Sequence, residues 1–250
     1  MKINVLDVRH WTLSLCAVLC AACAPMPVGT PLDSTQAAAV PAVTVGESWT
    51  YRVRDGFTGL DRGTERYLVQ QMSAGNITVA RERSGIEEVQ VYDNGWNWLK
   101  RPATNMQPFD YSPAYPAFDF PLAPGKRWNA RVTATDPRDG RRFPVHLDGQ
   151  VIGWERIKVP AGEFDALKIV RTVYVDYWEI SVRGSSRIIE QEWYAPAVKQ
   201  SVRRETTSRY WSWLGELDDG FVRVRGRDGG GPQWLQDDWL VYELVSHTAK

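Results

Sequence analysis

The sequence predicts a mostly β protein, built as a curved antiparallel sheet (a half-barrel or open barrel) with little helix outside an N-terminal signal peptide. From residue 45 onward, short runs rich in β-branched and aromatic residues recur, separated by turn residues at intervals of roughly 8 to 12 residues. Asn94-Gly95, between two such runs, is a strong hairpin signal. Both observations favour neighbouring strands that pair in antiparallel fashion.

The expected strands fall into two groups. The first group covers 49–55, 65–72, 76–83, 87–93 and 96–100. The second covers 128–135, 141–147, 149–159, 164–178, 186–195 and 198–207, with shorter runs near 211–214, 221–225 and 239–245. Gly46-x-x-Trp49 recurs as Gly125-x-x-Trp128. Residues 45–250 therefore form a single β-rich domain, or two related β-units over 45–100 and 125–250.

Residues 102–125 interrupt the strand pattern with six prolines among aromatic residues. Proline lacks the N–H that a central strand needs, and it breaks helices. We therefore expect a long aromatic loop that packs over the sheet.

The N-terminus has the organisation of a secretory signal peptide over residues 1–22. Lys2 and Arg9 provide a basic start, and the apolar stretch 11–22 is too short to span a membrane. Leu19-Cys20-Ala21-Ala22-Cys23 resembles the lipobox of bacterial lipoproteins. That resemblance implies acylation of Cys23, with palmitate among the acyl chains, and an outer membrane lipoprotein that faces the periplasm. Ordinary cleavage after Ala22 would instead give a soluble periplasmic protein.

Residues 23–44 are rich in proline and alanine and contain no aromatic residue. Such a stretch buries little apolar surface, so we expect a lipid anchor at Cys23 followed by a disordered tether.

Composition excludes several classes of function. The chain has 250 residues, with 30 basic and 30 acidic side chains, so it lacks the positive excess typical of nucleic-acid binding. All three cysteines lie in the first 23 residues, and only three histidines are present. We therefore expect no disulfide framework, no metal site and no cofactor.

The sequence contains few residues in patterns typical of catalytic sites. After the leader only His146 and His247 remain, and no Gly-x-Ser-x-Gly elbow occurs. We expect His146 to face solvent or a groove, and His247 to lie in a frayed C-terminus. Glu190 and Glu192 share one strand face, but solvated acids are the simpler interpretation. The sequence therefore predicts a protein that is not an enzyme and has no catalytic residue.

Tryptophan and arginine provide the candidate binding residues. Most of the 12 tryptophans are expected in the core. Trp96/Trp98 and Trp211/Trp213 are spaced so that both rings of a pair share a strand face, where they line a sugar or lipid platform or fill an internal interface. Arg223 and Arg225 are expected on one strand face. There they bind an acidic headgroup or glycan, or form a solvated edge of the sheet. Arg203-Arg204 adds a further positive spot.

One segment resembles a known group of proteins. Val159-Pro160-Ala161-Gly162-x-Phe164, followed by Trp193-Tyr194-Ala195-Pro196, resembles a motif of secreted bacterial β-proteins and lipoproteins of unknown function. The fold of these proteins is similar to lipoprotein-carrier-like folds, in which a curved sheet wraps around a helix or an apolar groove. The resemblance implies no catalytic residue. In physical terms, Pro160 favours a turn, Gly162 permits positive φ, and Phe164 begins an inward-facing row.

Two functional hypotheses follow. The first is a non-enzymatic cell-envelope lipoprotein, held to the membrane by its N-terminal lipid. It binds an amphiphilic or hydrophobic ligand, such as a lipid or lipoprotein acyl chain, or scaffolds an envelope partner. The alternative is a carbohydrate- or peptidoglycan-binding module that uses exposed tryptophans. The first predicts tryptophans around a concave apolar pocket, and the second predicts a shallow exposed platform.

Overall fold

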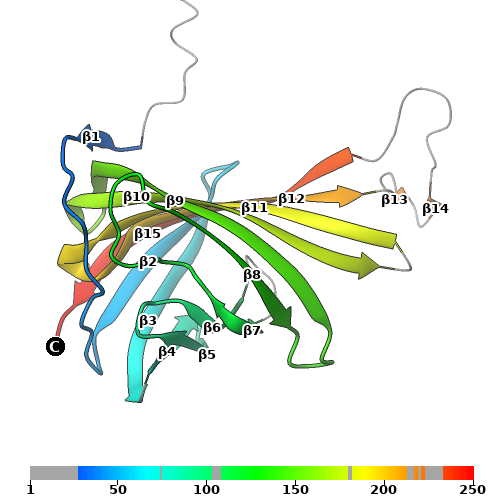
Figure 1. The fold of residues 1–250 in the computed structure, drawn as a ribbon, viewed down its shortest axis with the longest axis horizontal. Helices are drawn as coiled ribbons and strands as arrows, with labels where there is room; N and C mark the ends of the chain where they lie inside the picture. The colour runs from blue at the N-terminus through cyan, green and yellow to red at the C-terminus, as the bar shows by residue number, and fades with distance from the viewer. Residues whose placement is uncertain are drawn as a thin grey trace, which may run out of the picture.

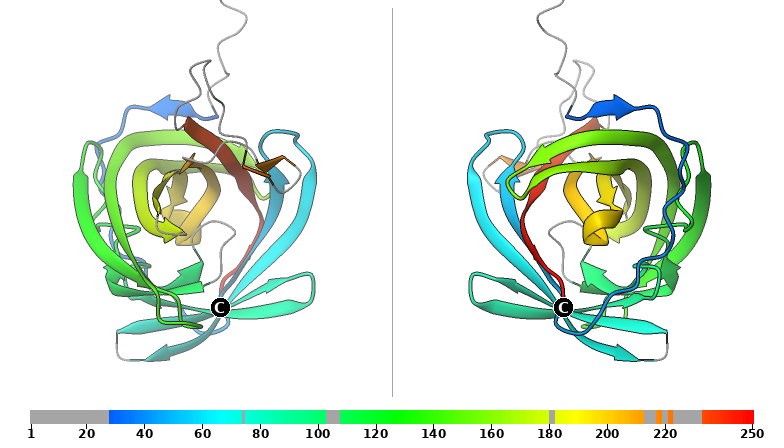
Figure 2. Two further views of the ribbon diagram at one scale, coloured as in Figure 1. Left: turned by 90° about the vertical axis from the view of Figure 1, so that its right-hand side faces the viewer. Right: turned by 90° about the vertical axis from the view of Figure 1, so that its left-hand side faces the viewer.

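The chain folds into an antiparallel β-barrel whose strands pair in a closed ring (Figures 1 and 2). The computed structural model describes residues 28–73, 75–102, 108–179, 182–212, 217–218, 221–222 and 233–250. Around the ring the strand order is β9-β10-β11-β12-β15-β2-β3-β4-β5-β6-β7-β8, and β8 pairs with β9 to close it.

The first half of the wall consists of β2 (Ser48–Asp55), β3 (Asp61–Ser73), β4 (Asn76–Arg83), β5 (Ile86–Asp93), β6 (Trp98–Pro102) and β7 (Pro108–Tyr115). The second half consists of β8 (Arg127–Thr135), β9 (Arg142–Val159), β10 (Gly162–Glu179), β11 (Val182–Ala195), β12 (Gln200–Ser212) and β15 (Gln233–Thr248). β13 (Leu217–Asp218) and β14 (Phe221–Val222) form a separate two-stranded sheet.

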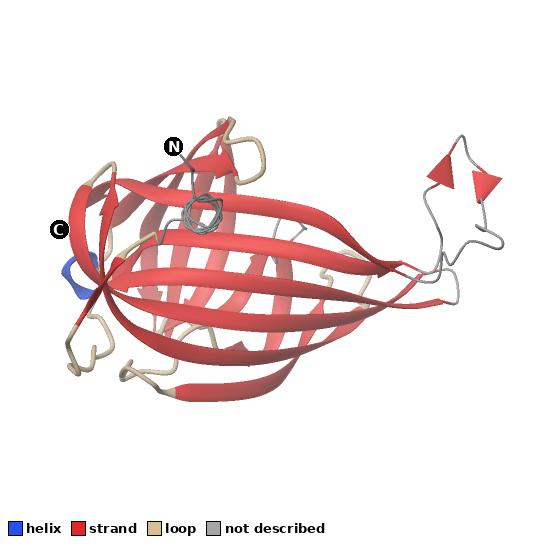
Figure 3. Cartoon of the chain, turned by 90° about the horizontal axis from the view of Figure 1, so that it is seen from above, coloured by secondary structure: helices blue, strands red, loops and turns tan. Residues whose placement is uncertain are grey.

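Helix is almost absent from the described residues. Within the described residues there is one 3-10 turn, η2 (Pro196–Val198), which lies between β11 and β12 and is blue in Figure 3. None of the described segments forms a helix with the length and apolar character needed to cross a membrane. The prediction of a mostly β protein with little helix is confirmed.

The expected open or half-barrel is wrong, because the long strand β9 closes the ring. Its first part pairs with β8, from Arg142↔Thr135 to Gln150↔Arg127. Its last part pairs with β1 (Thr30–Leu32), which lies against Trp154–Arg156. Closure gives each wall strand a pairing neighbour on both sides, and this reduces the template for edge-to-edge aggregation.

The free tether predicted for residues 23–44 is not seen from Thr30 onward. The segment runs along the outside of the barrel, as the blue stretch in Figure 2 shows. Ala38 forms a β-bridge with Leu122, and Trp154 Nε1 donates to the Gln36 carbonyl at 2.8 Å. Ala38 and Val43 are buried. Small residues let this segment lie close to the wall, where its backbone groups find partners. Composition alone does not reveal this docking.

The predicted loop over 102–125 is also partly wrong, because β7 lies within it and pairs with both β6 and β8. Pro108 is the first residue of the strand, where a missing N–H matters least. The pairing with β8 ends at Ser112, so Pro113 follows the last ladder position. The inward side chains Phe109, Tyr111 and Tyr115 are buried. Their burial supports a strand despite the prolines.

Gly149 permits a close approach between β8 and β9. It lies opposite Trp128, and a Cβ at position 149 would lie 2.2 Å from the indole ring. Trp128 Nε1 donates to the Pro116 carbonyl at 2.9 Å, so the ring cannot move without losing that bond. We expect Gly149→Ala to lower the free energy of unfolding by about 1–3 kcal/mol in urea denaturation.

Gly153 provides the matched control on the same strand. A Cβ at position 153 meets no atom within 4 Å. Gly153→Ala should therefore change the free energy of unfolding by less than about 0.5 kcal/mol. Equal losses for the two variants would contradict the role assigned to the contact between Gly149 and Trp128.

Candidate functional site

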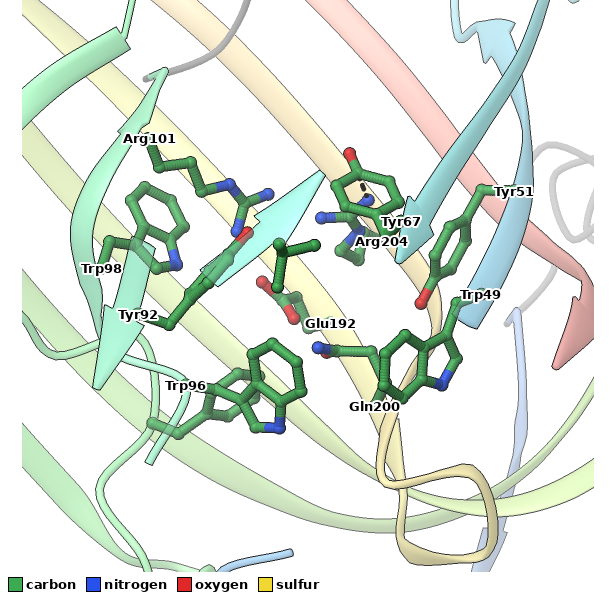
Figure 4. A pocket seen from close by; sticks show the side chains of 12 residues that line it. Trp49, Tyr51, Tyr67, Tyr92, Trp96, Trp98, Arg101, Glu192, Gln200 and Arg204 are labelled. Atoms are coloured by element: carbon green, nitrogen blue, oxygen red, sulfur yellow. Dashed lines mark hydrogen bonds between the residues drawn. The ribbon is translucent and has the colours of Figure 1, made fainter. Parts of the chain in front are cut away.

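Two adjoining cavities lie inside the barrel, between the wall formed by β2–β6 and the wall formed by β11, β12 and β15. Their volumes are about 20 Å³ and about 40 Å³. We call the first the aromatic cavity (Figure 4) and the second the polar cavity. The two share five lining residues: Tyr67, Trp98, Arg101, Glu192 and Arg204.

Large rings form most of the aromatic cavity. Trp49 packs edge-on against Trp96, with ring centroids 5.7 Å apart, and Tyr92 packs edge-on against Trp96 at 5.2 Å. Trp98 stacks on Tyr115 at 4.2 Å. All five side chains are buried. They come from β2, β5, β6, β7 and the turn before β6, so the ring of strands brings together aromatic residues that are far apart in sequence.

A buried ionic cluster lies on the β10–β11 side of the barrel. Arg171 Nε donates to Glu190 Oε2 at 2.6 Å, and Arg171 Nη2 donates to Glu192. Tyr115 donates its hydroxyl to Glu190 at 2.9 Å, and Ser201 donates to Glu192. Arg171 is 1% exposed, so these bonds satisfy charges that water does not reach.

This cluster corrects the interpretation of Glu190 and Glu192 as solvated acids. Both carboxylates are buried, and both are held by Arg171. The spacing of two residues places them on one strand face, but the matching arginine lies on the neighbouring strand β10. Only the pairing of Arg171 with Glu190 in the sheet reveals the cluster.

A second buried pair lies on β3 and β4. Arg81 donates to both oxygens of Glu65, at 2.6 and 2.9 Å, and Tyr67 donates to Glu65 at 2.7 Å. Glu65 is 0% exposed. Burial alone would raise the pKa of Glu65, but the hydrogen bonds and charge of Arg81 lower it below its usual value. Glu65 is therefore ionised and fully engaged by the fold.

Glu192 also stays ionised. Burial alone would raise its pKa, but the charges of Arg171 and Arg204 and the hydrogen bond from Ser201 lower it. An ionised carboxylate bound to an arginine is poorly suited to donate a proton as a general acid. The geometry therefore favours binding and charge compensation over proton transfer.

Two arginines that face the cavities lack a carboxylate of their own. Arg204 makes no ion pair with any described acid, and its one hydrogen bond to the described chain goes to the Tyr67 hydroxyl at 3.3 Å. Arg101 lies over the face of Trp98, 4.2 Å from the ring centroid, also without an ion pair to a described residue. Figure 4 shows both guanidinium groups directed into the aromatic cavity.

Trp96 and Trp98 both line the aromatic cavity. Their expected arrangement as neighbours on one strand face is wrong, because Trp96 lies in the turn before β6 with a φ of 61°. The hairpin between β5 and β6 at Asn94-Gly95 is confirmed. The positive φ at Trp96 turns its indole into the interior.

The second candidate pair is only partly described. Trp211 is half-buried and packs edge-on against Trp234, with centroids 5.4 Å apart. Trp213, Arg223, Arg225 and Cys23 lie outside the described residues. Among the described tryptophan side chains, Trp234 is the most exposed, at 41%. Most described tryptophans are thus enclosed, as expected from their total area.

The motif residues take structural positions. Pro160 lies in the two-residue turn between β9 and β10, and Gly162 has a φ of 133°, as expected for its role in the turn. Phe164 is half-buried against the core. Trp193 and Tyr194 are buried at the end of β11, and Pro196 begins η2. The helix that the resemblance implies inside the sheet is absent from the described residues. Aromatic and charged side chains line the interior, where the resemblance implies an apolar groove.

His247 corrects the expectation of a frayed C-terminus. It lies in β15, stacks on Trp49 with centroids 5.5 Å apart, and places Nε2 2.9 Å from Glu47 Oε1. His146 is half-buried on β9, and its side chain has no hydrogen bond to a described residue. The described residues also contain no cluster of three or more side chains suited to hold a metal ion.

A wider hollow of about 330 Å³ lies near the surface, lined by residues of β11, β12, β15 and the turn after β2. Phe57 packs edge-on against Trp239 there, with centroids 5.4 Å apart. Arg187 and Arg209 border it but are exposed to water, which can satisfy their charges. The interior cavities are the stronger candidate, because the unpaired Arg204 is buried there, where water does not satisfy its charge.

Arg204, the main functional candidate, appears in the sequence only as part of a positive spot with Arg203. The two residues differ in their surroundings: Arg203 bonds Glu205 and Glu243, whereas Arg204 is enclosed by tyrosines. Side chains alternate along a strand, so Arg203 and Arg204 point to opposite faces of the sheet. Which of the two faces lies inside depends on closure of the barrel.

Comparisons with known proteins give matches among solved structures only. No family model and no curated protein matches the chain. A protein from Parabacteroides distasonis described as a lipoprotein has 17% identity and a TM-score of 0.49, covering 85% of this chain and 100% of its own. An exported protein with a YmcC-like fold from Bacteroides fragilis has 16% identity and a TM-score of 0.46, covering 84% and 99%. YmcC of Escherichia coli, described as a hypothetical lipoprotein, has 12% identity and a TM-score of 0.42, covering 80% and 84%.

Proposed function

We propose that the protein is an exported cell-envelope protein that holds an amphiphilic ligand by its polar end inside the barrel. The observation that carries this proposal is the pair of interior cavities. Their walls combine stacked indole and phenol rings with charged groups that the fold itself does not use. Sites for small ligands typically combine apolar walls with a few directed polar groups in this way.

The size of the cavities indicates which part of the ligand enters. A buried water needs roughly 10–15 Å³ of such space, so volumes of about 20 and 40 Å³ hold only a few waters. A small headgroup of a few non-hydrogen atoms matches this size, and a long acyl chain does not. Arg101, Pro102, Thr206 and Tyr242 around the polar cavity are half-buried, so the rest of the ligand can leave on this side.

Export and membrane attachment belong to the same proposal. The signal-peptide pattern over residues 1–22 and the lipobox-like run ending at Cys23 support them. An acyl chain on Cys23 would keep the barrel at the outer membrane, close to lipids and lipoproteins.

The glycan-binding alternative is less well supported. A glycan platform needs exposed indole faces side by side, and Trp234 is the one described tryptophan that is more than a third exposed. Its neighbour Trp211 is half-buried. The enclosed rings of Trp49, Trp96 and Trp98 favour a ligand that enters the barrel.

Titration with amphiphiles tests the proposal. The purified protein is titrated with dodecyl phosphate, dodecanoate, dodecyl maltoside and dodecyltrimethylammonium, each below its micelle-forming concentration, while tryptophan fluorescence is recorded. We expect saturable binding of at least one amphiphile at one molecule per chain, because a headgroup in the aromatic cavity changes the surroundings of three buried indoles. Absence of saturable binding for all four would contradict the proposed function. Free maltose as a separate arm tests the glycan alternative.

A further inference from the structure

The guanidinium group of Arg204 is buried without adequate partners. The residue is 9% exposed, and its Nε has no hydrogen-bond acceptor among the described atoms. Its one hydrogen bond, to Tyr67, is long for a charged donor. An arginine has five N–H donors, and a buried donor without an acceptor is unfavourable because it has lost its hydrogen bonds to water. The fold therefore holds a cation whose donors are available.

Three tyrosine rings hold Arg204 in place. Its Cζ lies 4.9 Å from the centroid of Tyr51, 5.2 Å from Tyr67 and 4.7 Å from Tyr242. Cation–π contacts of this kind stabilise the charge and fix the position of the group. They provide no in-plane acceptor for its N–H donors, and Nε has no acceptor among the described atoms.

Nearby acids do not supply that acceptor. Glu190 and Glu192 are bound by Arg171, and Glu65 is bound by Arg81. Of the arginines that line the cavities, Arg81 is paired with Glu65, whereas Arg101 and Arg204 have no carboxylate partner among the described residues.

Arg204 remains charged in this setting. Burial alone would lower its pKa, but the electrostatic influence of Tyr67, Tyr51 and Glu192 raises the pKa well above its usual value. A charged donor with unsatisfied N–H groups inside an aromatic chamber is the feature that recognises carboxylates and phosphates in proteins.

We infer that the aromatic and polar cavities bind an anionic headgroup, a carboxylate or a phosphate monoester, between Arg204 and Arg101. Arg204 donates in-plane hydrogen bonds to the anion, and Arg101 supplies a second positive charge from above the Trp98 ring. The indoles of Trp49, Trp96 and Trp98 form the wall around the headgroup. The alkyl chain leaves past Pro102, Thr206 and Tyr242. This inference rests on the proposed function and names the chemistry of the ligand's polar end.

The same four amphiphiles test the inference, because they share one alkyl chain and differ in the headgroup. We expect dodecyl phosphate or dodecanoate to bind at least tenfold more tightly than dodecyl maltoside, and dodecyltrimethylammonium to bind most weakly. Preference for one of the two anions supports the inference and identifies which anion the site recognises.

Arg204→Met removes the anion-binding group while keeping a long apolar side chain. We expect the affinity for the preferred anion to fall at least tenfold and the affinity for dodecyl maltoside to stay within twofold. Arg204→Lys, which keeps the charge but loses the planar donor fork, should restore part of the affinity. Arg156→Met, on the exposed pair with Asp165, is the matched control and should leave all affinities unchanged.

Folding of the variant can be checked separately. Arg204 has no acidic partner, so its replacement by methionine leaves no buried carboxylate unpaired and should preserve the cooperative thermal transition. If Arg204→Met fails to fold, Arg101→Met, at a half-buried position, carries the same test.

The outcomes separate the two proposals. Equal affinities of the wild-type protein for anionic and neutral amphiphiles would overturn the anion site and leave amphiphile binding standing. An unchanged anion affinity in both arginine variants would also overturn it. Failure of every amphiphile to bind would instead remove the proposed function itself.

Discussion

Arg171→Met is expected to lower the free energy of unfolding by about 3–5 kcal/mol, because it leaves two buried carboxylates without their cation. Arg171 is 1% exposed and bonds Glu190, Glu192 and the Ala117 carbonyl. Without it, Glu190 and Glu192 lose their buried cation and must draw water into the interior, which disrupts the packing. Equilibrium denaturation in urea at pH 7 measures the loss.

Arg156→Met is the matched control for this prediction. Arg156 also pairs with a carboxylate on a neighbouring strand, with bonds of 2.8 and 3.0 Å to Asp165, but its side chain is 56% exposed. Water screens such a pair, so we expect a loss much smaller than that of Arg171→Met. Equal losses for the two variants would show that burial adds nothing to the Arg171 cluster.

A combined variant distinguishes an unpaired charge from lost packing. Arg171→Met together with Glu190→Gln and Glu192→Gln removes the cation and both anions. We expect it to be more stable than Arg171→Met alone, since no buried charge remains without a partner. A combined variant that is less stable still would indicate that the shape of Arg171, and not its charge, supports the interior.

Local sequence patterns predict much of the strand content but not closure of the barrel. Turns such as Asn94-Gly95 and Pro160–Gly162 involve neighbouring residues, so spacing and residue type are sufficient to locate them. Pairing of β8 with β9 is also local. Pairing of β2 with β15, in contrast, joins residues that are nearly two hundred positions apart in the sequence. No local pattern records that contact.

The candidate site illustrates the same limit. Trp96 and Trp98 stand out in the sequence because two indoles are close together, and both reach the aromatic cavity. Arg204 and Arg171 do not stand out, because an arginine in a strand is ordinarily solvated. Their burial follows from the ring of strands, which turns one face of β10 and β12 inward.

Prolines and small residues are poor guides to local structure in this chain for a related reason. Pro108 and Pro113 suggest a loop, yet β7 tolerates them at its start and beyond its last pairing with β8. Ala38 lies in a stretch without aromatic residues, yet it is buried because Leu122 bonds its backbone. In both places a partner from a distant segment decides the conformation.

Glu65→Gln is expected to lower the free energy of unfolding by about 3 kcal/mol at pH 7, by removing the charge that Arg81 binds inside the barrel. The loss should depend on pH. The pKa of Glu65 is lowered in the folded protein from the usual 4.5: burial opposes this shift, but Arg81 outweighs burial. Its ionisation therefore stabilises the fold fully above pH 4.5, and this contribution is lost as the pH falls through the folded-state pKa.

The difference between wild type and Glu65→Gln should accordingly shrink as the pH is lowered below 4.5, because the wild-type carboxyl also becomes neutral. Urea denaturation at a series of pH values measures this difference. Glu82→Gln, at an exposed position on β4 next to Arg81, should change stability by less than about 0.5 kcal/mol at every pH. A difference for Glu65→Gln that stays constant down to the lowest pH at which the protein is folded would show that the loss comes from packing. The ionised pair between Glu65 and Arg81 would then not be what stabilises this side of the barrel.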